Sequence, residues 1–486
     1  GRLRGEFIPL MLGEEIYLLY LQIKNTWDPW NVFNPGKIVN TPPMDTSLRY
    51  SPGQTTAEIE TYFDFSEQDG ILRAAEMCNG SGDCRKTEKS GGTMCPSYMA
   101  TRNEKHTTRA RANILRETIT NSTQENKFDD EGLLDVLDLC LSCKGCKSEC
   151  PSNVDMAKLK AETFQHYYNK NGVKFRSLLI GNTPKINQLF ASIPWLYNLS
   201  TTGLLGKIIQ SATGFTTQRK LPSMSKITFA KWIKKHKQHG NFVHGSIYLY
   251  NDEFLNYYDL EIGQTAVKLL NRLGYQVIVP KIGMSGRTYL SKGMLIKARE
   301  IAEKNIADFA KTIPHDKVLI GIEPSAILSF RDEYPDLCRG DLKEKAKEIA
   351  KRTFLIEEFL AKELDEGRIS SSSFTDKEER VRMHGHCFQK ALSSLVPLKK
   401  ILMLPKNYSV LNIPSGCCGM AGSFGYEKEH YDISMKIGEL VLFPAIRSEK
   451  EATIISASGT SCRHQIADGT NRKAQHPVNI LYNALK

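Results

Sequence analysis

Short apolar runs and helical stretches alternate through the second half of the chain. The runs are rich in Val, Ile and Tyr, and they are SIYLY, YQVIVP, KVLIGI, VRMHG and ATIISAS. Between them lie helical stretches such as residues 262–275 and 294–313. This alternation predicts α/β layers with largely parallel strands.

The first half has a different pattern, in which helical segments surround clustered cysteines. Residues 132–143 and 154–168 carry apolar side chains at roughly helical spacing, and seven cysteines lie between residues 55 and 165. We therefore expect a helical, ferredoxin-like domain over residues 49–165. For the whole chain the two patterns together predict an α+β multidomain fold.

Residues 166–242 connect these halves and contain an apolar part followed by the basic stretch KWIKKHKQH. The favoured interpretation is a helical linker whose short helices pack the two domains together. The alternative is that its apolar part lies on a membrane face.

Residues 1–48 carry turn signals at Asp28-Pro29 and Asn34-Pro35-Gly36, with a linker expected at Pro42-Pro43, and cannot fold alone. Because the chain opens at Gly1 without Met, in what looks like the middle of a domain, we expect a further region upstream.

Composition changes this picture little. A length of 486 residues predicts two or three domains, and 41% hydrophobic with 24% charged residues is typical of folded globular proteins. The net charge of +11 is mild, with Lys and Arg scattered among Asp and Glu, so we expect no nucleic-acid partner. No apolar run reaches the roughly 18 to 20 residues of a transmembrane helix, and no signal peptide opens the chain. We expect a cytoplasmic protein, with weak attraction to an anionic membrane or an acidic protein as its charge-driven contact.

The twelve cysteines are expected to be metal ligands or reactive thiols, because reducing compartments do not sustain disulfides. Cys140, Cys143, Cys146 and Cys150-Pro151 match the run C-x2-C-x2-C-x3-C-P, in which three thiolates hold one 4Fe-4S cluster. Gly145 permits a close approach of the backbone to sulfide. A zinc site would need two separated CxxC pairs, so the iron-sulfur interpretation is favoured.

A second cluster is specified less completely. In two-cluster ferredoxins the fourth cysteine of the run serves the other cluster, so the first cluster would take Cys95 as its remaining ligand. The second is then left with Cys78, Cys84 and Cys150, since Ser81 stands where a middle cysteine would be. Three thiolates fit a 3Fe-4S cluster, a 4Fe-4S cluster with an oxygen or nitrogen ligand, or an empty site. We favour a second cluster.

A third site is predicted where strands of the last α/β unit end. Loops at the carboxyl ends of parallel strands face one crevice, so four cysteines far apart in sequence could meet there: Cys387, Cys417, Cys418 and Cys462. His386 and His464 flank them as further candidate ligands or proton carriers, and the site would hold an iron-sulfur cluster or zinc. The alternative is buried, unreactive thiols, which is also our interpretation of the isolated Cys338.

The segment HGHCFQK also groups three polar side chains that an ordinary core strand would not carry, His384, His386 and Gln389. A binding role and a structural role for them are both left open.

The C-terminal half contains an internal repeat. The cysteines follow strands within Gly385–Cys387, Gly416–Gly419 and Gly459–Cys462. Residues 250–252, 283–286 and 323–326 stand at nearly the same separations without cysteines. We expect two duplicated α/β units, residues 243–377 and 378–486, of which the first has lost its ligands.

These motifs resemble one family, the fused flavin and iron-sulfur dehydrogenases of D-2-hydroxy acids. The matching strings are GGTMCPSYMATR, CLSCKGCKSECP, GIEPSAILSFRDEYPDL, HGHCFQKAL, SGCCGMAGSFGYEKEHY and GTSCRHQIADGT, while RLRGEF and NVFNPGKIV are similar to the end of a FAD-linked oxidase domain. The last units are similar to the cysteine-rich CCG domains of glycolate oxidase iron-sulfur subunits and heterodisulfide reductases. Gly459 departs from that pattern, which usually has a cysteine there.

The resemblance implies an upstream FAD domain or flavoprotein subunit that oxidises a small D-2-hydroxy acid, such as D-lactate, D-2-hydroxyglutarate or glycolate. Electrons would pass from FAD through 4Fe-4S clusters to a quinone or a soluble carrier. It identifies no catalytic residue in this chain. Two rivals remain: a stand-alone iron-sulfur subunit with its flavin on another chain, and a zinc-stabilised interaction module without redox function.

Overall fold

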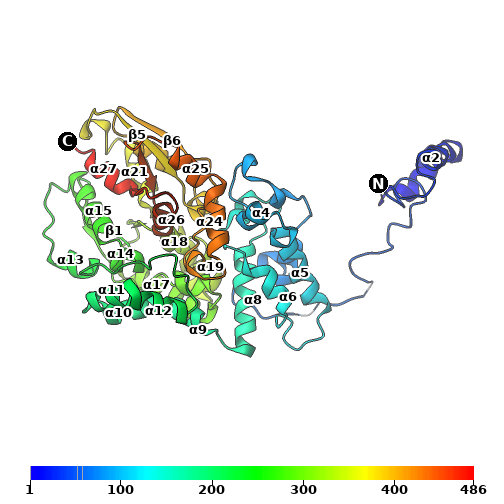
Figure 1. Ribbon diagram of the computed structural model, residues 1–486, viewed down its shortest axis with the longest axis horizontal. Helices are drawn as coiled ribbons and strands as arrows, with labels where there is room; N and C mark the ends of the chain where they lie inside the picture. The colour runs from blue at the N-terminus through cyan, green and yellow to red at the C-terminus, as the bar shows by residue number, and fades with distance from the viewer. Residues whose placement is uncertain (1, 52, 57) are drawn as a thin grey trace. The chain divides into compact units, whose positions relative to one another are not determined.

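The computed structural model describes residues 2–51, 53–56 and 58–486, which form two compact units, Gly1–Ala57 (unit 1) and Glu58–Lys486 (unit 2). Figure 1 labels their elements. Unit 1 contains α1 (Ile8–Leu12) and α2 (Glu14–Trp27), and neither helix has a buried residue. Asp28 ends α2 and its carboxylate accepts hydrogen bonds from the backbone N–H groups of Val32 and Phe33, at 2.8 and 2.9 Å. The linker expected at Pro42-Pro43 lies inside this unit.

Unit 2 begins with a helical region that contains all seven clustered cysteines. Its helices are α3 (Ile71–Glu76), α4 (Pro96–Thr101), α5 (Thr108–Asn121), α6 (Glu131–Asp138), α7 (Gly145–Glu149) and α8 (Met156–Asn171). The side chains of Thr107, Asp130 and Asp155 cap α5, α6 and α8 by accepting backbone N–H bonds. The two helices expected over residues 132–143 and 154–168 are therefore present, although α6 ends before the first cysteine of the run.

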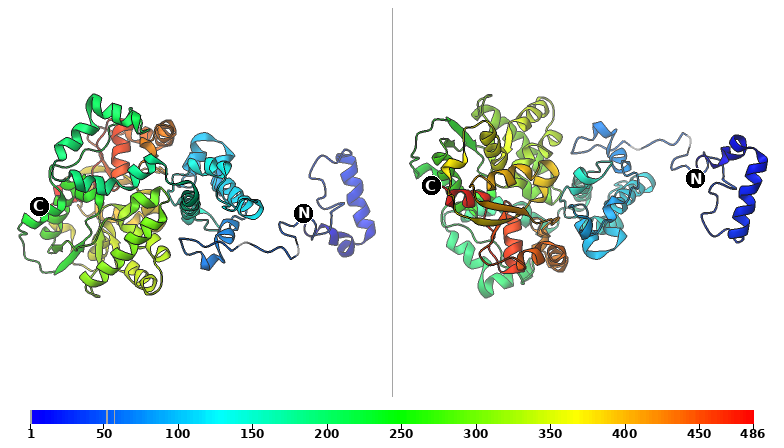
Figure 2. Two further views of the ribbon diagram at one scale, coloured as in Figure 1. Left: turned by 90° about the horizontal axis from the view of Figure 1, so that it is seen from below. Right: turned by 90° about the horizontal axis from the view of Figure 1, so that it is seen from above.

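Five short helices connect this region to the sheets. They are α9 (Phe175–Gly181), α10 (Thr183–Phe190), α11 (Pro194–Thr201), α12 (Gly203–Ala212) and α13 (Phe229–Lys235). Proline stands at the first turn of α10 and of α11, where its missing N–H costs nothing. Seen from below, these helices lie along one face of unit 2 (Figure 2).

The first sheet has the order β2-β1-β3-β4 and is parallel throughout. Its strands are β1 (Ser246–Leu249), β2 (Gln276–Ile278), β3 (Leu319–Gly321) and β4 (Thr353–Leu355). The helices around it are α14 (Glu253–Tyr257), α15 (Leu260–Arg272), α16 (Arg287–Ser291), α17 (Leu295–Thr312), α18 (Pro324–Ile327), α19 (Glu333–Leu337), α20 (Asp341–Lys351) and α21 (Ile356–Asp365). Strand β4 was not predicted, because α20 ends one residue before it and α21 begins directly after it, so no break in the sequence marks it.

The second sheet has the order β6-β5-β7 and is also parallel. Its strands are β5 (Glu379–His384), β6 (Tyr408–Asn412) and β7 (Ile454–Ala457). Its helices are α22 (Cys387–Leu392), α23 (Val396–Leu402), α24 (Tyr431–Leu440), α25 (Leu442–Arg447), α26 (Thr460–Thr470) and α27 (Pro477–Asn483). Strand β6, which the sequence placed before Gly416 without bounds, has one buried residue, Val410, so its apolar signal is weak.

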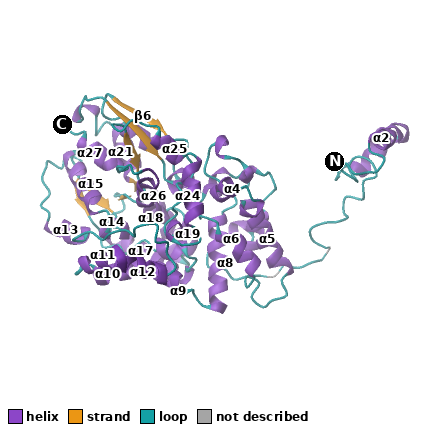
Figure 3. Ribbon diagram, viewed as in Figure 1, coloured by secondary structure: helices purple, strands orange, loops and turns teal. Residues whose placement is uncertain are grey.

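Both sheets place their first strand between the next two. Figure 3 shows that the strands lie in the α/β part of unit 2, among its helices, whereas the cysteine-rich part consists of helices and loops. The predicted combination of a helical cysteine-rich region with parallel α/β layers is therefore confirmed. Among the residues described, no helix combines the length and apolar character needed to cross a bilayer.

The helical region and the first sheet share one hydrophobic core, which includes Phe63, Leu137, Tyr289 and Phe330. Buried ion pairs join the same parts. Lys144, in the cysteine run, pairs with Asp332 and lies 3.1 Å from a carboxylate oxygen of Glu333 at the start of α19. The cysteine run is thus fixed to the α/β layers by both apolar packing and charge.

Candidate iron-sulfur and metal sites

The cysteine run folds as a tight loop around α7. Ser142 and Lys144 adopt left-handed backbone conformations, with φ of 51° and 60°, and so turn the chain between successive cysteines. Gly145 leaves room for another segment, since a Cβ there would lie 3.0 Å from the backbone nitrogen of Met94 and 3.1 Å from the carbonyl carbon of Thr93. Gly145 thus makes room for the backbone that precedes Cys95, a neighbour that the sequence did not indicate.

Glu149, between the third and fourth cysteines of the run, holds that backbone in place. Its carboxylate accepts hydrogen bonds from the N–H groups of Thr93, at 2.6 Å, and Met94, at 3.1 Å, and it also pairs with Lys86. These contacts of Glu149 therefore hold Cys95 next to the loop of Cys140–Cys146.

The first turn of α5 donates to two cysteine sulfurs. The N–H of Thr108 lies 3.0 Å from the Sγ of Cys95, and Cys84 accepts a bond from the backbone of Arg109. A hydrogen bond from the Cys95 thiol lowers the pKa of Cys84 to about 6, and in return the pKa of Cys95 is raised. Backbone donors aimed at sulfur favour thiolates, which are the ligands of an iron-sulfur cluster.

Burial and neighbouring thiols raise the pKa values of Cys143 and Cys146, the latter to about 12. Such thiols give up their protons when a metal takes them, so the donor set fits a cluster. Cys84 and Cys95 were predicted to serve separate clusters, but their thiols lie close enough to form a hydrogen bond with each other. Ser81 is exposed on a turn between Gly80 and Gly82, so it does not accompany the buried Cys84.

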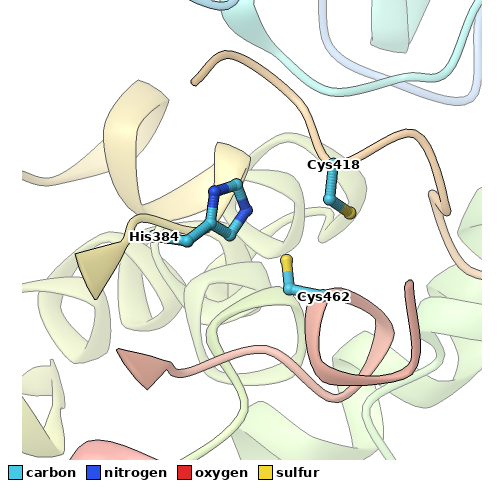
Figure 4. A group of neighbouring side chains, drawn as sticks. All are labelled: His384, Cys418 and Cys462. Carbon is cyan, nitrogen blue, oxygen red and sulfur yellow. The ribbon is translucent and has the colours of Figure 1, made fainter. Parts of the chain in front are cut away.

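The second cysteine group lies at the carboxyl ends of three parallel strands. His384 ends β5, Cys418 follows β6, and Cys462 follows β7 in the first turn of α26. Figure 4 shows these three side chains pointing toward one another. One ligand atom from each lies within 4.8 Å of the others, and all three residues are buried.

His384 has the arrangement of a metal ligand. Its Nδ1 lies 2.8 Å from the Ser415 hydroxyl, while its buried Nε2 has no nitrogen or oxygen partner among the residues described. Burial lowers the pKa of His384, so the ring is neutral near pH 7. A neutral imidazole held through one nitrogen, with the other nitrogen beside thiols, fits zinc or iron.

The four thiols form a continuous row, from Cys387 through Cys417 and Cys418 to Cys462. Hydrogen bonds between neighbours lower the pKa of Cys387 to about 6 and lower that of Cys418, while they raise those of Cys417 and Cys462. The half-buried Lys390 lies beside the row and donates to the carbonyl oxygens of Ser415, at 2.6 Å, and Gly416, at 2.8 Å. It thereby supplies a positive charge next to thiolates, a role that no sequence pattern indicated.

His386 and His464 lie near the row but have other partners. His386 Nδ1 caps α22 by accepting the N–H of Phe388 at 3.2 Å, and its Nε2 lies 4.0 Å from Glu323. His464 Nδ1 lies 3.0 Å from the Tyr426 hydroxyl. The histidine that joins the thiols is His384, whose role the sequence left open. Gly459 cannot carry a side chain without displacing the His386 ring.

The corresponding loops of the first sheet hold carboxylates instead of thiols. The buried Glu253 accepts bonds from the N–H and hydroxyl of Ser285, at 2.8 and 2.7 Å. The buried Glu323 accepts the N–H of Thr460 at 2.8 Å. Each carboxylate thus has a hydrogen-bond donor from the protein, which explains how this sheet end is filled without cysteines.

Cys338 is fully buried in the core, and burial raises its pKa to about 12.

A third group of acidic and histidine side chains is an ion-pair network. Glu427 pairs with Lys292 and lies 3.3 Å from Arg176, and His430 Nε2 lies 2.8 Å from Asp138. Because cations already neutralise these carboxylates, the group attracts a metal ion only weakly.

The two thiol-rich regions adjoin each other. Helix α7, inside the cysteine run, packs against α22, which begins at Cys387. The charge of Cys387 contributes to the raised pKa of Cys143. Beside them is a cavity of about 370 Å³, lined on one side by Ser142 and Lys144 and on another by thiols of the second group. Helices α9–α12 contribute apolar side chains such as Ile186 and Ile209 to its wall.

Comparisons with known proteins agree with this chemistry. Residues 77–155 match the family model described as a 4Fe-4S dicluster domain, a span that includes all seven cysteines of the helical region. D-2-hydroxyglutarate dehydrogenase of Escherichia coli K12 is 24% identical over 532 residues, covering 99% of this chain and 50% of the relative. The chain thus spans about half the length of that curated relative.

Two shorter relatives from Escherichia coli K12 are components of larger enzymes by name. The C subunit of anaerobic glycerol-3-phosphate dehydrogenase is 25% identical, over 65% of this chain and 79% of the relative. The glycolate oxidase iron-sulfur subunit is 21% identical, over 89% of this chain and 99% of the relative. Together with the dicluster match and the cysteine geometry, these similarities show that the chain resembles part of D-2-hydroxyglutarate dehydrogenase and the iron-sulfur subunit of glycolate oxidase.

Proposed function

We propose that the chain is the iron-sulfur electron-transfer portion of a flavin-dependent D-2-hydroxyacid dehydrogenase. Its substrate would be D-lactate, D-2-hydroxyglutarate or glycolate, and its electrons would come from FAD and leave to a quinone or a soluble carrier. The observation that carries the proposal is the contact between the two thiol-rich regions, where α7 packs against α22 and Cys387 helps to raise the pKa of Cys143 beside one cavity.

The dicluster region supplies the first set of ligands. We assign Cys95, Cys140, Cys143 and Cys146 to one 4Fe-4S cluster, and Cys78, Cys84 and Cys150 to a second one. Bound clusters of this type carry one electron at a time. The chain's own part is to hold the thiolates, to shield them within the shared core and to direct the N–H groups of α5 at Cys84 and Cys95.

The third site would hold an iron-sulfur cluster or zinc through Cys387, Cys417, Cys418 and Cys462. We place His384 ahead of His386 and His464 as its nitrogen ligand, because the His384 Nε2 is buried and directed at Cys418 and Cys462. Ser415 orients this ring, and Lys390 fixes the loop that carries the vicinal cysteines.

We further propose the domain organisation expected from the sequence. Residues 1–48 would be the tail of a FAD-linked oxidase domain, and the exposed apolar side chains of α2 support a packing partner for it. Residues 49–165 would be the ferredoxin-type domain and 166–242 the helical linker. The shared strand order of the two sheets supports residues 243–377 and 378–486 as duplicated CCG-type units, the first with carboxylates in place of ligands.

A stand-alone subunit is the second candidate. It is favoured by the glycolate oxidase iron-sulfur subunit, which this chain matches over 99% of the relative's length. In that case the flavin would sit on a separate chain. For either candidate we expect a cytoplasmic protein that can associate peripherally with the membrane.

Reduction of the clusters by substrate tests the proposal. The native protein, purified anaerobically with its flavin-carrying segment or partner, is mixed with each of the three hydroxy acids while the cluster absorbance and EPR signal are followed. Bleaching and a new reduced-cluster signal with at least one D-2-hydroxy acid are expected. Clusters that dithionite reduces and no hydroxy acid reduces would contradict the dehydrogenase assignment.

A further inference from the structure

One long segment of this chain contains basic residues and no acidic ones. Residues 163–251 contain twelve Lys and Arg and no Asp or Glu. The remaining residues contain 53 Lys and Arg against 54 Asp and Glu, so this segment accounts for the whole net charge of +11. Lys and Arg are as frequent in this segment as in the rest of the chain, so its positive charge comes from the absence of Asp and Glu, and a local positive surface follows.

The same segment exposes large apolar side chains. On α11 and α12, which pack against each other, Trp195 is 66% exposed, Leu204 77% and Ile208 58%. Leu189 on α10 and Leu199 on α11 are exposed as well. Figure 1 shows these helices side by side along one edge of unit 2. We call this set the α10–α12 face.

Lysines lie among these apolar residues without acidic partners. Lys185 is on α10, Lys207 is on α12, and Lys220 follows α12; all three are exposed, and none forms an ion pair with any described residue. The two arginines of the segment instead pair with acidic residues outside it, since Arg176 pairs with Glu429 and Arg219 lies 2.8 Å from Asp468. The free positive charge is thus carried by the outward lysines.

The outward apolar residues are not needed for the fold of the segment. Its inward residues already line the cavity or are buried, such as Ile186, Tyr197, Thr201 and Gln210. Short helices with one apolar face outward and lysines among them are typical of segments that lie in a membrane interface. The centre of a protein–protein interface is instead depleted of Lys. The phosphate backbone of a nucleic acid provides no apolar surface against which Trp195, Leu204 and Ile208 could be buried.

We propose that the α10–α12 face docks on an anionic lipid bilayer. Trp195, Leu204 and Ile208 would enter the boundary between headgroups and acyl chains, while Lys185, Lys207 and Lys220 would contact the negatively charged headgroups.

Docking in this way has a consequence for the cavity. Ile209 is part of the cavity lining and is also exposed, so the cavity wall reaches the face that would meet the lipid. An acceptor dissolved in the membrane would therefore reach the cavity beside Cys387 and Cys418 without crossing water. This last step rests on the proposed electron-transfer function, whereas the docking face does not.

Co-sedimentation with vesicles tests the docking face. The full chain with its clusters is mixed with vesicles of phosphatidylcholine alone, or with about one quarter phosphatidylglycerol. We expect binding to the anionic vesicles that weakens with salt. In the double variant Leu204→Glu, Ile208→Glu the partition coefficient should fall at least about tenfold. The matched control is Val396→Glu on α23, a residue that is 71% exposed outside the segment, and it should bind like the wild type.

A second variant separates charge from apolar contact. Lys185→Gln with Lys207→Gln should weaken binding to anionic vesicles and leave the smaller binding to neutral vesicles unchanged. Wild-type protein that stays in the supernatant with both vesicle types, or equal losses in the double variant and the Val396→Glu control, would overturn the inference. Retention of a DNA duplex in place of vesicles would overturn it as well, in favour of a nucleic-acid surface.

Iron and sulfide are counted in every sample, so that the two proposals fail separately. Absent vesicle binding with full sulfide content would overturn the docking face alone. Vesicle binding by protein that contains no sulfide would leave the docking face standing and overturn the proposed electron-transfer function.

Discussion

The two thiol-rich regions of unit 2 differ in how they are assembled. In the first, Cys140, Cys143 and Cys146 lie within seven residues of one loop, and left-handed turns at Ser142 and Lys144 direct them. In the second, His384, Cys418 and Cys462 come from the ends of three strands far apart in sequence. A local loop can hold ligands with little help, whereas the second site exists only when the sheet and its neighbours are formed.

The largest expected effect comes from removing a ligand of the local site. Cys143→Ser should lose about four irons per chain with the matching sulfide, and the EPR signal of the reduced protein should disappear or change. Cys338→Ser is the matched control, because that thiol is buried in the core away from both sites. Equal iron loss in both variants would contradict a specific ligand role for Cys143.

The second prediction separates the two sites. His384→Ala should remove metal from the strand-end site and leave the EPR signal of the local cluster intact, since His384 groups with Cys418 and Cys462 of the second site. We expect the metal affinity of that site to fall at least about 100-fold. His464→Ala serves as the comparison, because its Nδ1 faces Tyr426 and it should keep the metal. Metal loss in the His464 variant alone would reverse the assignment.

The third prediction concerns the connection between the two regions. Lys144→Met removes the buried cation that Asp332 and Glu333 share and leaves them Lys147 and Arg287, so the free energy of unfolding should fall by up to about 3 kcal/mol. Lys147 pairs with the same Asp332 from a partly exposed position, and Lys147→Met should cost about 1 kcal/mol or less. Denaturant unfolding of both variants measures the difference, and equal losses would contradict the role of burial.

The smallest effect is a pH dependence beneath the second site. Burial raises the pKa of Glu357 from 4.5 to about 7, and its carboxyl group bonds to Ser458, next to Gly459. Between these values the folded state keeps a proton that the unfolded chain releases, so the free energy of unfolding falls as pH rises from 4.5 to 7. The decline should be at most about 3 kcal/mol, and Glu357→Gln should abolish it. An unchanged pH profile in that variant would contradict the raised pKa.

The contrast also explains what sequence could predict. The run from Cys140 to Cys150 could be recognised because the spacing of its cysteines is that of cluster ligands. Cys95 could be added because it belongs to a second Cys-Pro pair. The four strand-end cysteines were found from the strands that precede them, yet the choice of His384 over His386 depends on ring orientation, which no spacing encodes. Lys390 and Glu149 gave no signal because they act on backbone groups brought near by the fold. Strand β4 was missed because it lies directly between helices α20 and α21, with no break in the sequence to mark it.

Iron-sulfur electron transfer is the property on which the rest depends. Its most direct test is an anaerobic count of iron, acid-labile sulfide and zinc, together with low-temperature EPR of the dithionite-reduced protein. We predict a brown protein with sulfide in proportion to iron, about four or eight irons in the dicluster region, and a reduced-cluster signal. A colourless protein that holds zinc and contains no sulfide would contradict this role and leave a structural module in its place.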